Sequence, residues 1–157
     1  MVGPERQYFT AELEPFVPSA QPKPVFGELN HIAVLVRDLP AAIGRYQSAF
    51  GATLVEQETL PNKADVAVLE LGGMHIEFLS TREPDSKVGK LLEELGEGVH
   101  HLSYSVADLD GTMQRLRNAG LRFRDQVPRP GLHGRRIAFL EPEDTCGVLI
   151  ELVGETP

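Results

Sequence analysis

The stretch NHIAVLVRDL at residues 30–39 recurs as HHLSYSVADL at residues 100–109. The 70-residue offset aligns His31 with His101 and Asp38 with Asp108. In both copies alternating apolar residues predict a strand, and the aspartate that follows can cap a helix. Two further pairs of segments recur at nearly the same spacing: VAVL at 66–69 with IAFL at 137–140, and IEFL at 76–79 with IELV at 150–153. The pattern indicates a duplicated architecture.

Working outward from the repeat, each half reads as one strand, one helix and three strands. The predicted fold is therefore α+β, with two tandem βαβββ modules forming a curved, half-open barrel. Module one covers residues 28–83, a linking helix lies in 84–97, and module two covers 98–157. The expected strands that follow the helices are 52–58, 65–71 and 74–80 in module one, and 122–127, 135–140 and 147–153 in module two. Residues 1–27 hold five of the twelve prolines and read as an arm, which could cover the domain or cross to a partner subunit.

Composition limits the classes of function. The 157 residues include 15 basic and 23 acidic side chains, a net charge of −8, which disfavours binding to nucleic acid or anionic membranes. The single cysteine cannot form an internal disulfide, and no apolar run approaches the roughly 18 residues of a membrane-spanning helix. We expect a cytoplasmic protein that acts on a small molecule.

Strand alternation separates the polar side chains from the packed face of the sheet. Ile32 and Val34 point to one face and His31 to the other, and the same alternation isolates His101, Glu77 and Glu151. A single histidine at such a position is more often a hydrogen-bonded strand residue, and a single glutamate is more often solvated at an edge. Because two histidines and two glutamates recur at equivalent places, the sequence predicts a site for a divalent ion such as cobalt, manganese, nickel, iron or zinc.

The remaining histidines have weaker patterns. His75 shares the face of Glu77 and is expected to line the site, whereas His100 points the other way and suits a core or capping role. His133 lies in a glycine-flanked loop that either bends over the site or is merely exposed.

These residues resemble the vicinal oxygen chelate superfamily, the fold of glyoxalase and bleomycin resistance proteins. Within it, the chain is similar to methylmalonyl-CoA epimerases in GEGVHH at 96–101, IAFL at 137–140 and GVLIEL at 147–152. The resemblance implies a cation, most often Co²⁺, and an acyl-CoA substrate whose oxygens complete the coordination. The implied ligands are His31, Glu77, His101 and Glu151, and Glu151 is also expected to move a proton. Members of this superfamily often pair, so we expect a homodimer.

The resemblance implies an epimerase or racemase of methylmalonyl-CoA or a similar 2-substituted malonyl thioester, working through a metal-stabilised enediolate. Inversion requires a second acid–base group, for which Asp65 is the predicted residue and Glu70 or a water are alternatives. The segment PNKAD at 61–65 departs from the pattern of the epimerases. A glyoxalase I-type lyase or isomerase, or a ring-cleaving dioxygenase, therefore stays open as the alternative, with a metal-free binding module as a third class.

Overall fold

The structure, a computed structural model, describes residues 24–154. This part of the chain forms eight strands and three α-helices, with two short 3₁₀ helices in its second half. They are β1 (Leu29–Leu35), α1 (Leu39–Phe50), β2 (Thr53–Thr59), β3 (Asp65–Leu71), β4 (Met74–Ser80), α2 (Lys87–Leu95), β5 (Gly98–Val106), α3 (Leu109–Asn118), β6 (Arg129–Pro130), η1 (Leu132–Gly134), β7 (Arg136–Phe139), η2 (Pro142–Thr145) and β8 (Ile150–Gly154).

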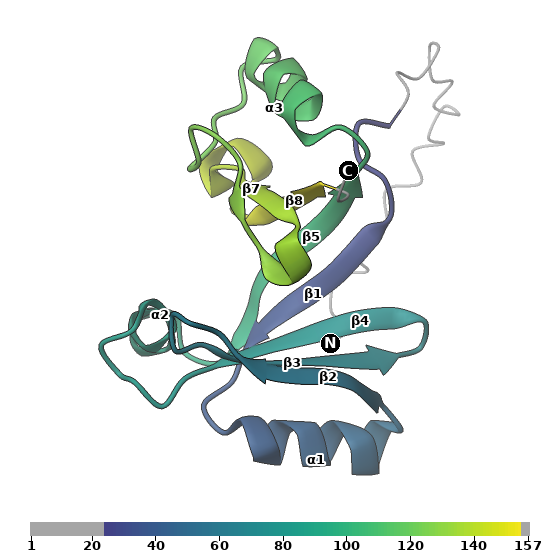
Figure 1. Cartoon of the computed structure of the whole chain (residues 1–157), viewed down its shortest axis with the longest axis vertical. Helices are drawn as coiled ribbons and strands as arrows, with labels where there is room; N and C mark the ends of the chain where they lie inside the picture. The colour runs from purple at the N-terminus through teal and green to yellow at the C-terminus, as the bar shows by residue number, and fades with distance from the viewer. Residues whose placement is uncertain (1–23, 155–157) are drawn as a thin grey trace, which may run out of the picture.

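All eight strands belong to one mixed sheet in the order β2-β3-β4-β1-β5-β8-β7-β6. The first strands of the two halves, β1 and β5, pair antiparallel at its centre, and each pairs parallel with the last strand of its own half. The sheet curls, with α1 beneath the first half and α3 against the second (Figure 1). The predicted α+β fold of two βαβββ modules in a half-open barrel is confirmed.

Local signals set the helix boundaries. The Asp38 side chain accepts a hydrogen bond from the backbone N of Ala41 at 2.9 Å, and Asp108 caps α3 in the same way. Ser86 caps α2. Gly51 ends α1 with a φ of 73°, a left-handed conformation that favours glycine.

Two apolar clusters pack α1 and α3 against one face of the sheet. Under α1 the buried residues are Val36, Leu39, Ile43, Ala52, Ala67, Leu69 and Phe78. Under α3 they are Val106, Leu109, Met113, Leu116, Phe123, Ala138, Leu140 and Leu152. The opposite face, here called the open face, carries His31, Glu77, His101 and Glu151, because side chains alternate along a strand. Within residues 24–154, no helix has the length and apolar content needed to cross a bilayer.

The strand predicted at 122–127 is absent from the structure. Phe123 forms an isolated bridge to Leu140, and regular pairing resumes only in the two-residue β6. Among the described residues, backbone pairing of this segment is limited to the bridge, where the backbone N atoms of Arg124 and Glu141 donate to the carbonyls of Phe139 and Arg122. Side chains then hold the segment: the Arg117 guanidinium donates to the carbonyls of Asp125 and Gln126, and the Asp125 carboxylate accepts from the backbone N of Phe139. The segment therefore bends instead of extending.

Most of the predicted arm lies outside the described residues. Of its last positions, Val25 and Phe26 pack against the α3 cluster, and the backbone N of Gly27 donates to the Ser105 carbonyl at 2.7 Å. The end of the predicted arm thus contacts the second module of the same chain.

Candidate metal centre and active site

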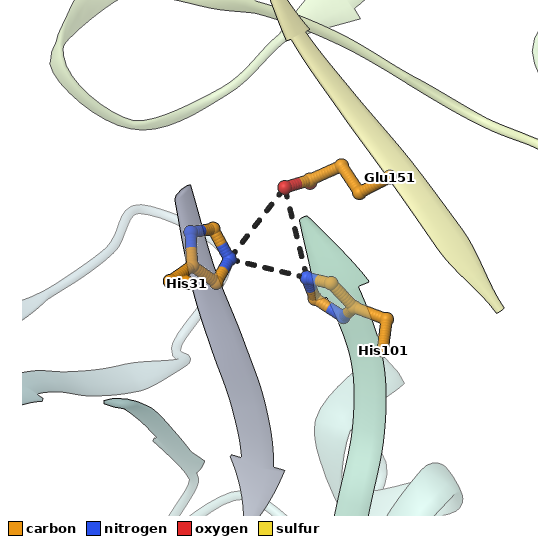
Figure 2. Close-up of side chains that lie close together, drawn as sticks. All are labelled: His31, His101 and Glu151. Atoms are coloured by element: carbon orange, nitrogen blue, oxygen red, sulfur yellow. Dashed lines mark hydrogen bonds and ion pairs between the residues drawn. The ribbon is translucent and has the colours of Figure 1, made fainter. Parts of the chain in front are cut away.

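Three side chains from three strands meet on the open face (Figure 2). Nε2 of His31 on β1 lies 3.3 Å from Nε2 of His101 on β5. Each of these nitrogens lies 3.6 Å from Oε2 of Glu151 on β8. The three ligand atoms are within 4.8 Å of one another, close enough to surround a single ion.

Strand register explains why these residues meet. Ala33 pairs with His101, and His31 pairs with Ser103 across the antiparallel β1/β5 ladder. Ser103 in turn pairs with Glu151 in the parallel β5/β8 ladder. Because laterally paired residues point to the same face, both histidines and Glu151 are held side by side by backbone hydrogen bonds.

Neighbouring groups hold the His31 ring in one tautomer. Its Nδ1 lies 3.0 Å from Oδ1 of Asn30, whose amide nitrogen donates to the Ser105 hydroxyl. A carboxamide oxygen only accepts, so Nδ1 carries the proton and Nε2 presents a lone pair to the centre. Burial lowers the pKa of His31 to about 4, against the opposing charge of Glu151, and the ring is neutral at physiological pH.

His101 has a comparable partner, because its Nδ1 lies 2.9 Å from Nδ1 of His100. Burial, followed by the charge of His101, lowers the pKa of His100 to about 4. His100 is therefore neutral, and its Nδ1 can accept a hydrogen bond from Nδ1–H of His101. A hydrogen bond at the ring nitrogen that points away from the ion is typical of metal-bound histidines. His100 was expected to have only a core or capping role, and this support of His101 was not predicted.

Glu151 is 5% exposed and accepts a hydrogen bond from the fully buried Ser103 hydroxyl at 2.7 Å. Burial alone would raise the pKa of Glu151, but its contacts with His101 and His31 and the Ser103 hydrogen bond together lower it. Two imidazoles and an ionised carboxylate are a donor set that fits a borderline divalent cation. The hydrogen bond from Ser103 to Glu151 had no signal in the sequence.

Glu77 lies at the edge of this set, as the remaining predicted ligand. Its Oε1 is 3.9 Å from Nε2 of His31, and the residue is 7% exposed. Burial raises the pKa of Glu77 to about 8, helped by the negative charges of Glu151, Glu56 and Glu58. A nearby cation would reverse this shift and ionise Glu77.

The structure does not bring Asp65 to the site, and its predicted acid–base role needs correction. Asp65 shares a face of β3 with Ala67 and Leu69, which pack under α1, so it points away from the open face. Its carboxylate accepts from the Thr59 hydroxyl and lies 3.7 Å from the Arg82 guanidinium. These contacts suit a structural residue at the end of β3.

A second group of ionisable side chains lies on β2 and η1. The ligand atoms of Glu56, Glu58 and His133 are within 4.8 Å of one another, and Nε2 of His133 is 3.1 Å from Oε2 of Glu56. The η1 loop reaches module one, since Leu132 packs against the cluster that contains Leu35 and Val66. His133 therefore does more than sit in an exposed loop. Neither glutamate was predicted as a site residue, although their spacing of two along β2 indicates a shared face.

Comparisons with known proteins agree with this geometry. The model of the Glyoxalase/Bleomycin resistance protein/Dioxygenase superfamily matches residues 30–139. An ethylmalonyl-CoA/methylmalonyl-CoA epimerase of Cereibacter sphaeroides is 34% identical over 131 residues, 82% of this chain and 98% of its own length.

Solved structures show the same likeness. The crystal structure of methylmalonyl-CoA epimerase from Mycobacterium tuberculosis superposes with a TM-score of 0.78 at 32% identity, covering 87% of this chain and 93% of its own. A methylmalonyl-CoA epimerase in complex with methylmalonyl-CoA and NH4+ gives a TM-score of 0.75 at 33% identity, with 83% and 96% covered. The chain belongs to the Glyoxalase/Bleomycin resistance protein/Dioxygenase superfamily, and within it the chain is similar to the methylmalonyl-CoA epimerases.

Proposed function

We propose that the chain is a metal-dependent epimerase of methylmalonyl-CoA or a similar 2-substituted malonyl thioester. The observation that carries the proposal is the convergence of His31, His101 and Glu151, with both rings oriented from behind by Asn30 and His100. The likeness to epimerases over more than four-fifths of the chain supports the substrate class.

His31, His101 and Glu151 would hold the cation, with Glu77 at its edge as a fourth ligand. Cobalt is the proposed ion, and manganese, nickel, zinc or iron suit the same donors. When bound, such an ion would supply positive charge near the thioester and carboxylate oxygens, which acidifies the C–H between them. We also propose a homodimer and a cytoplasmic location.

Glu151 would exchange a proton with the carbon that is inverted. A carboxylate that is ionised at rest can act as a base, and its low pKa is consistent with that starting state. Ser103 holds one oxygen of the carboxylate from the β5 side, so the direction of attack is fixed. The buried surroundings of both residues exclude water from the proton in transit.

The test follows deuterium uptake. Metal-stripped protein is loaded with Co²⁺ and given methylmalonyl-CoA in D₂O, and deuterium at C2 is measured by mass spectrometry. We expect exchange that requires the metal and that is lost in Glu151→Gln for the enantiomer whose C2 hydrogen faces Glu151. Glu94→Gln, an exposed position on α2, is the matched control and keeps full exchange. Absence of exchange in the metal-loaded protein would refute the proposal.

A ring-cleaving dioxygenase is the second candidate, favoured by one observation. Two histidines and one carboxylate with a further position open are also the ligand set of non-haem Fe(II) oxygenases. The two candidates differ in their co-substrate, so an Fe²⁺-loaded sample supplied with a catechol should consume O₂ only if the second candidate is correct.

A further inference from the structure

Inversion at a carbon centre needs proton transfer on both faces of the substrate, and Glu151 can serve only one of them. This requirement rests on the epimerase function proposed above. Asp65 lies on the face of β3 that carries Ala67 and Leu69, opposite the open face. The second group must therefore come from another residue that faces the site.

One lateral row of paired residues crosses the open face from β2 to β5. Glu56 pairs with Val68, Val68 with Glu77, Glu77 with Ala33, and Ala33 with His101. Residues in such a row point to the same face of the sheet, about 4.8 Å apart from strand to strand. Glu56 thus stands at the far end of the row from His101, on the same face of the sheet.

Apolar or small side chains fill much of the surface between these ends. Val66 and Val68 on β3, and Ala33 on β1, have no proton to exchange. Glu77 belongs to the metal side, 3.9 Å from His31. Beyond Glu77 the open face also carries Glu56 and Glu58, whose charges act on Glu77, and His133 lies beside them. Glu70 and His75 share this face and pair with each other near the β3/β4 turn, but of the two histidines only His133 forms an ion pair with a carboxylate within residues 24–154.

The η1 loop holds His133 in place over this face. Leu132 is anchored against the cluster with Leu35 and Val66, and the His133 ring contacts Oε2 of Glu56 through Nε2 at 3.1 Å. A carboxylate in contact with an imidazole nitrogen orients the ring. His133 is also 47% exposed at its side chain, so the proton can equilibrate with solvent after each turnover.

We propose that His133, oriented by Glu56, is the second proton-transfer group, acting on the substrate face opposite Glu151. For one enantiomer Glu151 removes the C2 proton, the electron pair of the broken C–H bond stays on the substrate, and the protonated His133 ring delivers its proton to the other face of C2. For the other enantiomer the two groups exchange roles. Each turnover removes one proton from C2 and adds one proton to it. Proton exchange with water then returns Glu151 and His133 to their starting protonation states.

The experiment gives the Co²⁺-loaded full chain each enantiomer of methylmalonyl-CoA separately in D₂O. Inversion and deuterium uptake without inversion are measured in the same sample. We expect His133→Gln to slow inversion in both directions by about 10²–10⁴-fold, the usual contribution of a general acid–base group. Deuterium uptake by the enantiomer that faces Glu151 is retained, and uptake by its mirror image is lost. Glu56→Gln produces the same split to a smaller degree, whereas a merely structural role would lower both activities together.

Asp65→Asn is the matched control and keeps inversion at the wild-type rate. The inference is overturned if His133→Gln inverts the substrate as fast as the wild type, if it loses exchange of both enantiomers equally, or if only Glu58→Gln loses inversion. A wild type that exchanges neither enantiomer would instead refute the epimerase function itself, and this inference with it.

Discussion

Replacing Ser103 with alanine should weaken cation binding without unfolding the protein. Ser103 is fully buried on β5, and its hydroxyl donates to Oε2 of Glu151 at 2.7 Å. The substitution removes one oxygen atom and keeps the Cβ, so the strand and its pairing with β8 are preserved. What is lost is the group that fixes the orientation of the carboxylate.

The size of the effect follows from that one bond. A hydrogen bond to a charged group contributes about 1.5–3 kcal/mol, and a factor of ten in affinity corresponds to about 1.4 kcal/mol. The dissociation constant for Co²⁺ should therefore rise by about 10- to 100-fold, the range found for residues that orient metal ligands.

The assay is a Co²⁺ titration of metal-stripped protein, followed by calorimetry. Ser80→Ala is the matched control, since Ser80 is also buried but donates to the carbonyl of Arg37 at 3.3 Å, away from the centre. It should bind Co²⁺ as the wild type does. If Ser103→Ala also binds Co²⁺ with wild-type affinity, Ser103 does not support a metal ligand and the reasoning from its hydrogen bond is wrong.

Three other outcomes are expected. Co²⁺ at 100 times its dissociation constant should raise the free energy of unfolding by about 2.7 kcal/mol, measured by denaturant titration, and the gain should vanish in His101→Gln. The melting temperature of the metal-free protein should be highest near pH 6.5. At higher pH unfolding releases the proton that folded Glu77 keeps to about pH 8, so stability falls. At lower pH unfolding takes up protons on His31 and His100, which accept them only near pH 4 in the folded state, and these two groups outweigh the single carboxyl. Melting curves of Glu77→Gln should lack the alkaline decline, and its persistence would contradict this assignment. Leu152→Ala, fully buried under α3, should lower the free energy of unfolding by about 2–5 kcal/mol, whereas the exposed Val148→Ala should change it by less than about 0.5 kcal/mol; equal effects would show that the α3 cluster is not the core.

The fold was predictable where its signals are local. Asp38, Asp108 and Ser86 cap the helices expected from them, because a capping residue acts on backbone groups three positions away. The strand expected at 122–127 failed for the opposite reason. Arg117 and Asp125 redirect that segment through contacts with carbonyls and an amide that no local pattern reveals.

The site was predictable to the extent that it is repeated. His31 and His101 stand out because each copy of the repeat carries one, and the structure places their Nε2 atoms 3.3 Å apart. Asp65 could have been set aside from alternation alone, since it shares a face with Ala67 and Leu69. The contact of Glu56 with His133 joins separate modules, and it could not be inferred before the path of the η1 loop was known.

The antiparallel pairing of β1 with β5 makes the ion site a late product of folding. Ala33 and His101 pair although most of module one and α2 lie between them in the sequence. Contacts between such distant residues form slowly, because the chain loses conformational entropy in bringing them together before the contacts stabilise the fold. Glu151 arrives only when β8 has added beside β5. An intermediate with one formed module holds a single histidine of the site, so cation uptake during refolding should mark completion of tertiary structure, after the secondary structure of either half has appeared.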